Sequence, residues 1–316
     1  MILFERAELT VNIVFMGTPD FAVPCLKTLI KNGHDVTGVF CQPDKPKGRG
    51  YVLTPPPVKV EALKHDLPVF QPQSMKDGSA LAVLKSISPE LIVTAAYGKI
   101  LPQDILSLPK YGCINIHASL LPKYRGAAPI QWCVINGEKQ TGVTSMLMDV
   151  GLDTGDMLIS KTIAIPPEMT AGELHDKLSV LGAEVLEDTL EALENGTLVP
   201  VKQDDSSSSY APMLSKELCP IDWNESAESI HNKIRGLSPW PVASTKLNGK
   251  TLKIHKARPS DMSGEAGEVI ESTKRFIVAC GDLSIELLNV QLEGKRAMDS
   301  EDFLRGNAVK TGTRLE

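Results

Sequence analysis

The first part of the chain alternates short apolar runs with amphipathic segments, which predicts strands and helices in turn. Apolar runs of strand length lie at 11–16, 35–41, 69–70 and 91–96. Runs that are apolar throughout are typical of parallel strands buried on both faces. Helices are expected at 21–32, 58–66 and 79–86, the first of them closed by Gly33. This order predicts a doubly wound, Rossmann-like α/β fold with a mostly parallel sheet.

The pattern changes in the second half of the chain. Strands at 141–148 and 157–165 and a helix at 127–136 precede a long amphipathic helix at 170–195. The run VKQDDSSSS at 201–209 is typical of a linker. After it come a helix at 227–236 and short strands with close turns, such as Asn248-Gly249, which predict a small closed barrel. We therefore expect two domains, at 1–203 and 217–316, joined by a linker at 204–216.

Composition narrows the class of protein. Hydrophobic content of 42% and charged content of 23% are ordinary for a globular protein, and no apolar run approaches the roughly 20 residues of a membrane span. The first ten residues carry two acids and no long apolar segment, so we expect no signal peptide. The six cysteines contain no C-x-x-C pair, which argues against a zinc ribbon or a disulfide framework and favours a cytoplasmic protein. A net charge of −6 means that any nucleic acid must bind to local basic patches.

Two motifs carry candidate chemistry. The stretch GCINIHASLLP at 112–122 begins as a strand and breaks into a loop, and MDVGLDTGD at 148–156 leaves a strand with Asp153 between two glycines. Asn115 and His117 are two residues apart, so they point to the same side of an extended chain. An amide, an imidazole and a carboxylate form a plausible acid/base site. Either His117 or Asp153 could instead be structural, the histidine after a strand and the aspartate in a turn.

Tyr97 follows the strand expected at 91–96. Ligands of open α/β sheets bind at the carboxyl ends of strands. The strand ends at Tyr97 and at Asn115 and His117 are therefore expected to meet at one crevice.

These motifs, together with RGAAPIQ at 125–131, GTPDFA at 17–22 and QPDKPKGRG at 42–50, resemble those of the folate-dependent formyltransferases. The resemblance runs through nearly the whole chain from Asn12 onward and is strongest at 112–156. It implies transfer of a formyl group from 10-formyltetrahydrofolate to an amine. No metal ligands are evident in the sequence, so we expect no metal. It also implies an OB-like barrel for the C-terminal domain.

The resemblance assigns roles to individual residues. It makes Asn115, His117 and Asp153 catalytic. It places folate contacts on the SLLP loop and on the second motif, with Tyr97 at the neighbouring strand end: Ser119, Leu120, Leu121, Pro122, Asp149, Val150, Gly151 and Tyr97.

Two basic segments indicate which molecule accepts the formyl group. The resemblance implies that the loop at 42–50 enters the acceptor arm of methionyl initiator tRNA, through Lys45, Lys47, Arg49 and Gly50. Between 229 and 260 there are seven cations and no carboxylate, which favours a polyanionic partner. The candidates for tRNA contact there are Lys233, Arg235, Lys246, Lys250 and Lys253.

The alternative for the second basic segment is a solvated face whose cations are balanced in space by Glu265, Glu268 and Glu271. Trp240, between two prolines, could stack on a base, but we expect it to pack in the core, as such tryptophans more often do.

Formyl transfer to an amine passes through a tetrahedral oxyanion. Asn115 and protonated His117 could donate hydrogen bonds to it, and Asp153 could help to move the proton. The substrate amine is itself the nucleophile, so no nucleophilic side chain is needed. We expect the protein to be a monomer. Four alternatives remain: a nucleotide-sugar amine N-formyltransferase, a glycinamide-ribotide enzyme, a nicotinamide oxidoreductase and a non-catalytic tRNA-binding protein. The missing G-x-G-x-x-G fingerprint argues against the oxidoreductase.

Overall fold

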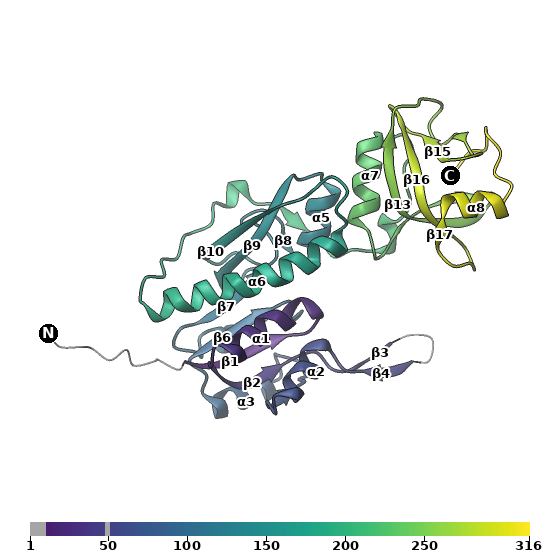
Figure 1. Ribbon diagram of the computed structural model, residues 1–316. Coiled ribbons are helices and arrows are strands. Elements are labelled where there is room, and N and C mark those ends of the chain that lie inside the picture. The colour runs from purple at the N-terminus through teal and green to yellow at the C-terminus, as the bar shows by residue number, and fades with distance from the viewer. Residues whose placement is uncertain (1–10, 48–50) are drawn as a thin grey trace. The chain divides into compact units, whose positions relative to one another are not determined.

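The computed structural model describes residues 11–47 and 51–316. These residues form two compact units, which Figure 1 shows in colours that follow the chain. The first unit comprises the residues up to Ala127, 142–163 and 176–210. The second comprises Ala128–Thr141, Ala164–His175 and Ala211–Glu316.

A seven-stranded sheet forms the centre of the first unit. Its order is β10-β9-β7-β6-β1-β2-β5. The strands are β1 (Asn12–Gly17), β2 (Asp35–Phe40), β5 (Val69–Phe70), β6 (Leu91–Ala95), β7 (Cys113–His117), β9 (Gln140–Leu147) and β10 (Met157–Ala164). From β7 to β5 all neighbours are parallel, and β9 is antiparallel to β7. The predicted doubly wound, mostly parallel fold is confirmed.

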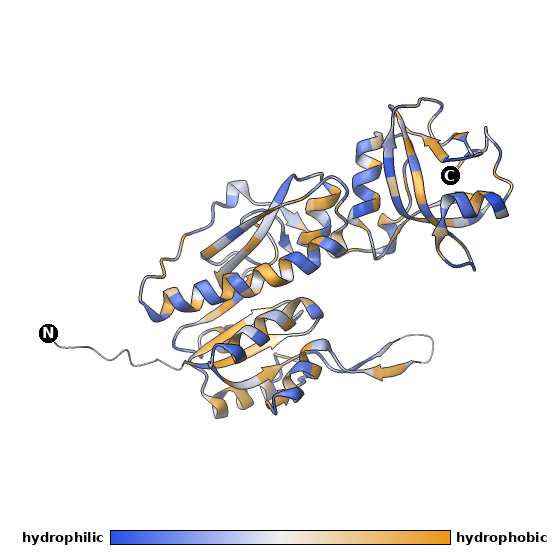
Figure 2. Ribbon diagram, viewed as in Figure 1, coloured by the Kyte–Doolittle hydropathy of each residue, from blue (hydrophilic) through white to orange (hydrophobic). Residues whose placement is uncertain are grey.

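Helices cover both faces of this sheet because the central strands are apolar on both sides. On one face Val14 and Met16 of β1 pack with Leu84 of α3 (Ser79–Ile87) and Ile105 of α4 (Gln103–Leu106). The other face carries η1 (Asp20–Ala22), α1 (Val23–Lys31) and α6 (Ala171–Glu194). Figure 2 shows the alternation of hydrophobic and hydrophilic residues along α6 that the sequence predicted. The helix α2 (Pro57–Lys64) completes the unit.

The segment at 42–57 was expected to be a loop, but part of it is a hairpin. Strands β3 (Lys45–Lys47) and β4 (Val52–Thr54) pair antiparallel, with Lys45 opposite Thr54. Strands this short give too little alternation for sequence analysis to detect, and β3 also contains Pro46. The two-residue strands β8 (Arg125–Gly126) and β11 (Tyr210–Ala211) escaped prediction for the same reason.

The second unit contains a curled antiparallel sheet of six strands, which is the smaller, OB-like part of the predicted fold. Its order is β12-β13-β16-β15-β14, with β17 paired to β16. The strands are β12 (Ala243–Leu247), β13 (Lys250–Ser260), β14 (Val269–Glu271), β15 (Phe276–Ala279), β16 (Ser284–Leu292) and β17 (Met298–Asp299). The unit also holds α5 (Pro129–Ile135), η3 (Lys216–Leu218), α7 (Ala227–Gly236) and α8 (Ser300–Gly306).

The core of this unit contains Trp223 rather than Trp240. Trp223 is 5% exposed, and its Nε1 donates a hydrogen bond to Thr245 Oγ1 at 3.0 Å. Trp240 follows the end of α7 and is 59% exposed. The prediction that Trp240 is a core residue is therefore wrong, because the interior that it was expected to fill is already closed by other side chains.

The serine run at 206–209, part of the expected linker, has ordered local structure. Asp204 accepts hydrogen bonds from the backbone and side chain of Ser206, which starts the short helix η2 (Asp205–Ser207). Ser209 Oγ accepts a hydrogen bond from the backbone N–H of Tyr124 at 2.9 Å. These contacts tie the run to the first unit. No helix in the described part of the chain is long and apolar enough to cross a membrane.

Candidate active site

Strand β7 carries Asn115 and His117 at its carboxyl end. Asn115 lies opposite Thr94 of β6, and His117 lies opposite Thr144 of β9. Pairing on both sides fixes the backbone, so the two side chains project from the same side of a rigid strand. His117 is buried, whereas Asn115 is half-buried.

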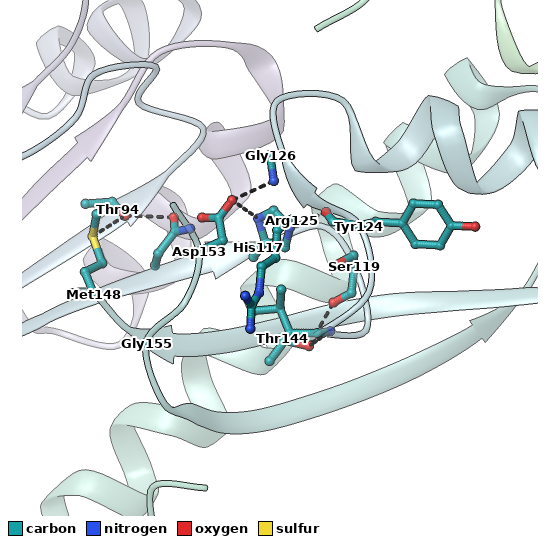
Figure 3. A network of polar contacts seen from close by, with 12 residues as sticks. Thr94, His117, Ser119, Tyr124, Arg125, Gly126, Thr144, Met148, Asp153 and Gly155 are labelled. Carbon is teal, nitrogen blue, oxygen red and sulfur yellow. Dashed lines mark hydrogen bonds and ion pairs between the residues drawn. The ribbon is translucent and has the colours of Figure 1, made fainter. Parts of the chain in front are cut away.

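Asp153 reaches His117 from the turn between β9 and β10 (Figure 3). Its Oδ2 lies 3.8 Å from His117 Nδ1 and accepts a hydrogen bond from the Gly126 N–H at 2.8 Å. Its backbone φ is +54°, a left-handed conformation that is strained for most residues with a side chain and tolerated best by Asn and Asp. At Gly155 a Cβ atom would lie 1.8 Å from the Leu147 carbonyl oxygen, so the turn also requires glycine.

The hydrogen bonds of His117 determine which ring nitrogen is free. Nε2 lies 3.0 Å from the carbonyl oxygen of Tyr124, which can only accept, so Nε2 carries a hydrogen. Nδ1 faces the carboxylate of Asp153. Exchange of a proton with a ligand therefore falls to Nδ1.

Gln203 holds the Asp153 turn in place, and sequence analysis missed it. Its Nε2 donates to the carbonyl oxygens of Asp153 at 2.9 Å and Gly155 at 2.7 Å. Its Oε1 accepts from Nε and Nη2 of Arg125, at 3.0 and 2.9 Å. Gln203 is only 5% exposed. A glutamine beside a serine run carries no local signal of such a role, which arises only from the tertiary fold.

The SLLP loop is fixed by its own hydrogen bonds. Ser119 is fully buried, and its Oγ donates to the Lys123 carbonyl oxygen at 2.7 Å. Thr144 Oγ1 donates to the Ser119 carbonyl oxygen and accepts from the Leu121 N–H. The hydroxyl of Ser119 is thus committed within the protein. Leu120 and Pro122 are partly exposed and available for contact with a ligand.

In the second motif, Asp149 shapes the turn. Its Oδ1 accepts from the Gly151 N–H at 2.9 Å and from Thr154 Oγ1 at 2.6 Å. Val150 and Leu152 are exposed in the same turn. This segment can offer apolar side chains and backbone groups to a ligand, while the Asp149 carboxylate is already bonded.

Tyr97 contributes its backbone rather than its ring. The hydroxyl lies 3.2 Å from Met75 Sδ in the core, and burial raises the pKa of the phenol. Its carbonyl oxygen accepts from Thr18 Oγ1 at 3.0 Å and from Gln42 Nε2 at 3.2 Å. Tyr97 lines the cavity where β6 ends, but its hydroxyl lies in the core.

A cavity of about 410 Å³ lies where β1 and β6 end. The strand order reverses between these two strands, and ligands of open α/β sheets bind at such switch points. The cavity is polar at Thr18, Gln42 and Lys45 and is otherwise walled largely by prolines. None of the described residues is part of a group of three or more His, Cys, Asp or Glu side chains that could hold a metal ion.

The residues expected to contact tRNA fall into several groups. Lys45 is exposed at the base of the β3–β4 hairpin, Lys47 belongs to β3, and Arg49 and Gly50 lie outside the described residues. In the second unit Lys246, Lys250 and Lys253 are exposed. Lys246 and Lys253 lie on the outward face of the β12–β13 pair, opposite Thr251 and Ser244. None of these three lysines has a carboxylate within ion-pair distance among the described residues.

Arg235 does not belong with them. It is 6% exposed, and its guanidinium donates to Asn232 Oδ1 at 2.9 Å and to the Met169 carbonyl oxygen at 3.0 Å. It lies next to Ile234 on the packed face of α7, which removes it from any RNA surface. Lys233 is half-buried, and its Nζ donates to the Pro220 carbonyl oxygen at 2.7 Å.

Two of the carboxylates suggested as counter-ions of the second basic segment have other partners. Glu271 pairs with Arg275 and Glu265 with Arg314, whereas Arg258 pairs with Glu286.

Comparison with known proteins defines the class. The family model described as "Formyl transferase" matches residues 11–193, and "Formyl transferase, C-terminal domain" matches residues 213–308. The chain belongs to the formyl transferase family.

Two similar curated proteins are methionyl-tRNA formyltransferases. The methionyl-tRNA formyltransferase of Geobacter metallireducens is 52% identical over 96% of this chain and 98% of its own length. That of Caldanaerobacter subterraneus is 53% identical over 96% of this chain and 100% of its own.

Solved structures share the fold at lower identity. The methionyl-tRNA formyltransferase from Clostridium thermocellum has a TM-score of 0.55 and 20% identity, covering 79% of this chain and 94% of its own. An N-formyltransferase from Helicobacter canadensis, in complex with folinic acid and dTDP-3-aminofucose, has a TM-score of 0.69 and 20% identity, covering 88% of this chain and 98% of its own.

Proposed function

We propose that this protein transfers the formyl group of 10-formyltetrahydrofolate to the amino group of methionyl initiator tRNA, giving formylmethionyl-tRNA in the cytoplasm. The observation that carries the proposal is the contact of His117 with Asp153, with Asn115 two residues away on the same strand. It occurs in a chain about half identical to methionyl-tRNA formyltransferases over nearly its whole length. We further propose that it acts as a monomer.

The site residues divide the chemistry among them. As the amine attacks the formyl carbon, Asn115 Nδ2 and the protonated Nδ1 of His117 donate hydrogen bonds to the developing oxyanion. Asp153 accepts the proton that the amine loses. His117 gives its Nδ1 proton to the folate nitrogen that leaves as its bond to the formyl carbon breaks. One proton is taken up and one is released, so the transfer balances without a metal or a covalent intermediate on the protein.

The substrates have distinct places in this proposal. The folate lies against Leu120 and Pro122 on one side and the backbone at 148–151 on the other. The methionyl end of the tRNA enters the cavity beside Thr18 and Gln42. Lys45 and the remainder of its hairpin, with Lys47, Arg49 and Gly50, contact the acceptor arm, and Lys246, Lys250 and Lys253 contact phosphates farther along the RNA.

We propose domain boundaries that follow the same division. Residues 1–203 carry the chemistry, 204–216 connect, and 217–316 bind tRNA. Because Ser209 accepts a hydrogen bond from the Tyr124 backbone, the connecting segment also supports the site.

A nucleotide-sugar N-formyltransferase is the second candidate, because the Helicobacter canadensis structure superimposes with the higher TM-score. At 20% identity that likeness shows the fold alone. The exposed, unpaired lysines of the second unit have a use with tRNA and none with a small sugar nucleotide.

Labelled formyl folate offered with charged initiator tRNA, free methionine or an amino-sugar nucleotide tests the choice. Formylation of the charged tRNA alone supports the proposal. Formylation of the sugar nucleotide instead would establish the second candidate.

A further inference from the structure

We propose that Thr94 orients the amide of Asn115 and thereby sets which group of that side chain faces the formyl oxygen. Thr94 is a positioning residue, since it touches Asn115 and not the reacting atoms. The inference rests on the proposed function, because it deepens the role of the same site.

Thr94 lies on a central strand of the sheet in the first unit. It lies on β6, between β1 and β7, directly opposite Asn115 in the parallel register, and it is 3% exposed. Its Oγ1 lies 2.8 Å from Asn115 Oδ1 and 3.4 Å from Met148 Sδ (Figure 3). One hydroxyl therefore joins the strand that bears Asn115 to the start of the Asp153 motif.

The hydroxyl has a single proton to donate. An amide oxygen at 2.8 Å is a far better acceptor than a thioether sulfur at 3.4 Å, so the proton goes to Asn115. This occupies Oδ1 and leaves Nδ2 with its two hydrogens directed away from Thr94. With the opposite orientation, Oδ1 would face the formyl oxygen, and two negative oxygens would repel each other as charge develops.

Asn115 has no second anchor in the described part of the chain, where no other side-chain hydrogen bond to it occurs. An amide held by one bond rotates when that bond is removed. Valine at position 94 would keep the shape and the strand preference of threonine while removing the only group that distinguishes Oδ1 from Nδ2. Serine would keep the hydroxyl.

The kinetic test uses Thr94→Val, Thr94→Ser and Asn115→Ala with charged initiator tRNA and saturating formyl folate. Loss of one oxyanion donor lowers kcat roughly 100- to 1,000-fold, and loss of its orientation costs part of that, about tenfold. We expect Thr94→Val to lower kcat about tenfold, with both KM values within about twofold, and Thr94→Ser to restore it. In the Asn115→Ala background Thr94→Val should change kcat less than about twofold.

A wild-type kcat for Thr94→Val, or an equal loss with and without Asn115, would overturn the inference. Wild-type protein that fails to formylate charged tRNA would instead refute the proposed function.

A second measurement can be made on the free protein, without a formyl-accepting substrate. The side-chain NH₂ signals of Asn115, assigned by their absence in Asn115→Ala, report the orientation directly in NMR spectra of the free protein. We expect one sharp pair in the wild type and in Thr94→Ser, and a shifted or broadened pair in Thr94→Val. An unchanged pair in Thr94→Val would overturn the inference whatever the substrate proves to be.

Discussion

Nδ1 of His117 lies 3.8 Å from Oδ2 of Asp153. The opposite nitrogen of the ring is held by the Tyr124 carbonyl oxygen, so the contact with Asp153 is at the nitrogen that remains free to exchange a proton. The Gly126 N–H holds the same carboxylate oxygen at 2.8 Å. The acid and the imidazole are thus each held by a backbone group.

The first prediction concerns the charge of Asp153. Asp153→Asn keeps the shape, tolerates the left-handed backbone and can still accept from Gly126, but it cannot take up a proton. We expect kcat for formyl transfer to fall at least about 100-fold, while folate affinity stays within about twofold. Steady-state kinetics and a binding titration check this, and Asp149→Asn in the same turn is the control, with a much smaller loss. A fall of less than threefold in Asp153→Asn would remove Asp153 from the chemistry.

The second prediction concerns the support of that turn. Gln203→Leu leaves the Asp153 and Gly155 carbonyl oxygens without this donor and removes one partner of the Arg125 guanidinium, which keeps its contact with Asp205. The unfolding free energy should therefore fall by about 1–3 kcal/mol. We expect kcat to fall about tenfold as the Asp153 turn loosens. Ser206→Ala, an exposed change nearby, should leave both quantities unchanged in denaturant titration and kinetics. Wild-type kcat in Gln203→Leu would show that the turn holds without this support.

The third prediction concerns Lys246 and Lys253. Replacing both with Ala should weaken binding of charged tRNA and reduce the slope of log K against log salt by about 2, because two phosphate contacts are lost. Turnover at saturating tRNA should not change. Arg258→Ala is the matched control, since Arg258 already pairs with Glu286. An equal effect of the control would mean that net charge, not a local surface, governs binding.

The fourth prediction is a pH effect on stability. Burial lowers the pKa of His231 below its ordinary 6.5, although Glu168 at 3.8 Å opposes the shift and Glu228 and Arg235 lie nearby. As pH falls below 6.5, the unfolded chain therefore takes up the proton first, and the unfolding free energy decreases until the folded pKa is reached. His231→Gln should flatten this pH dependence below about pH 6.5, as measured by denaturant titration. An unchanged slope would contradict the assignment.

Local patterns predicted the elements that depend on local physics. Two-residue alternation placed Asn115 and His117 on one side of a strand, because that geometry needs no tertiary information. The buried apolar runs predicted β1 and β6 to within a residue. Sequence analysis did not detect the Lys45–Lys47 strand, because the strand is short and contains a proline.

The remaining features depend on residues far apart in the chain. Gln203 meets Asp153 across 50 positions, and Thr94 meets Asn115 across 21. No local pattern distinguishes these two from ordinary polar residues. Arg235 was misassigned because counting cations ignores the face of the helix on which each lies, and α7 buries that face.

The most direct test of the account is single-turnover formylation of charged initiator tRNA by His117→Ala, with tRNA affinity measured in parallel. We expect formyl transfer to be lost, because no other group donates from the position of Nδ1, while the affinity for tRNA stays within about twofold. Formylation by purified His117→Ala at the wild-type rate would contradict the account.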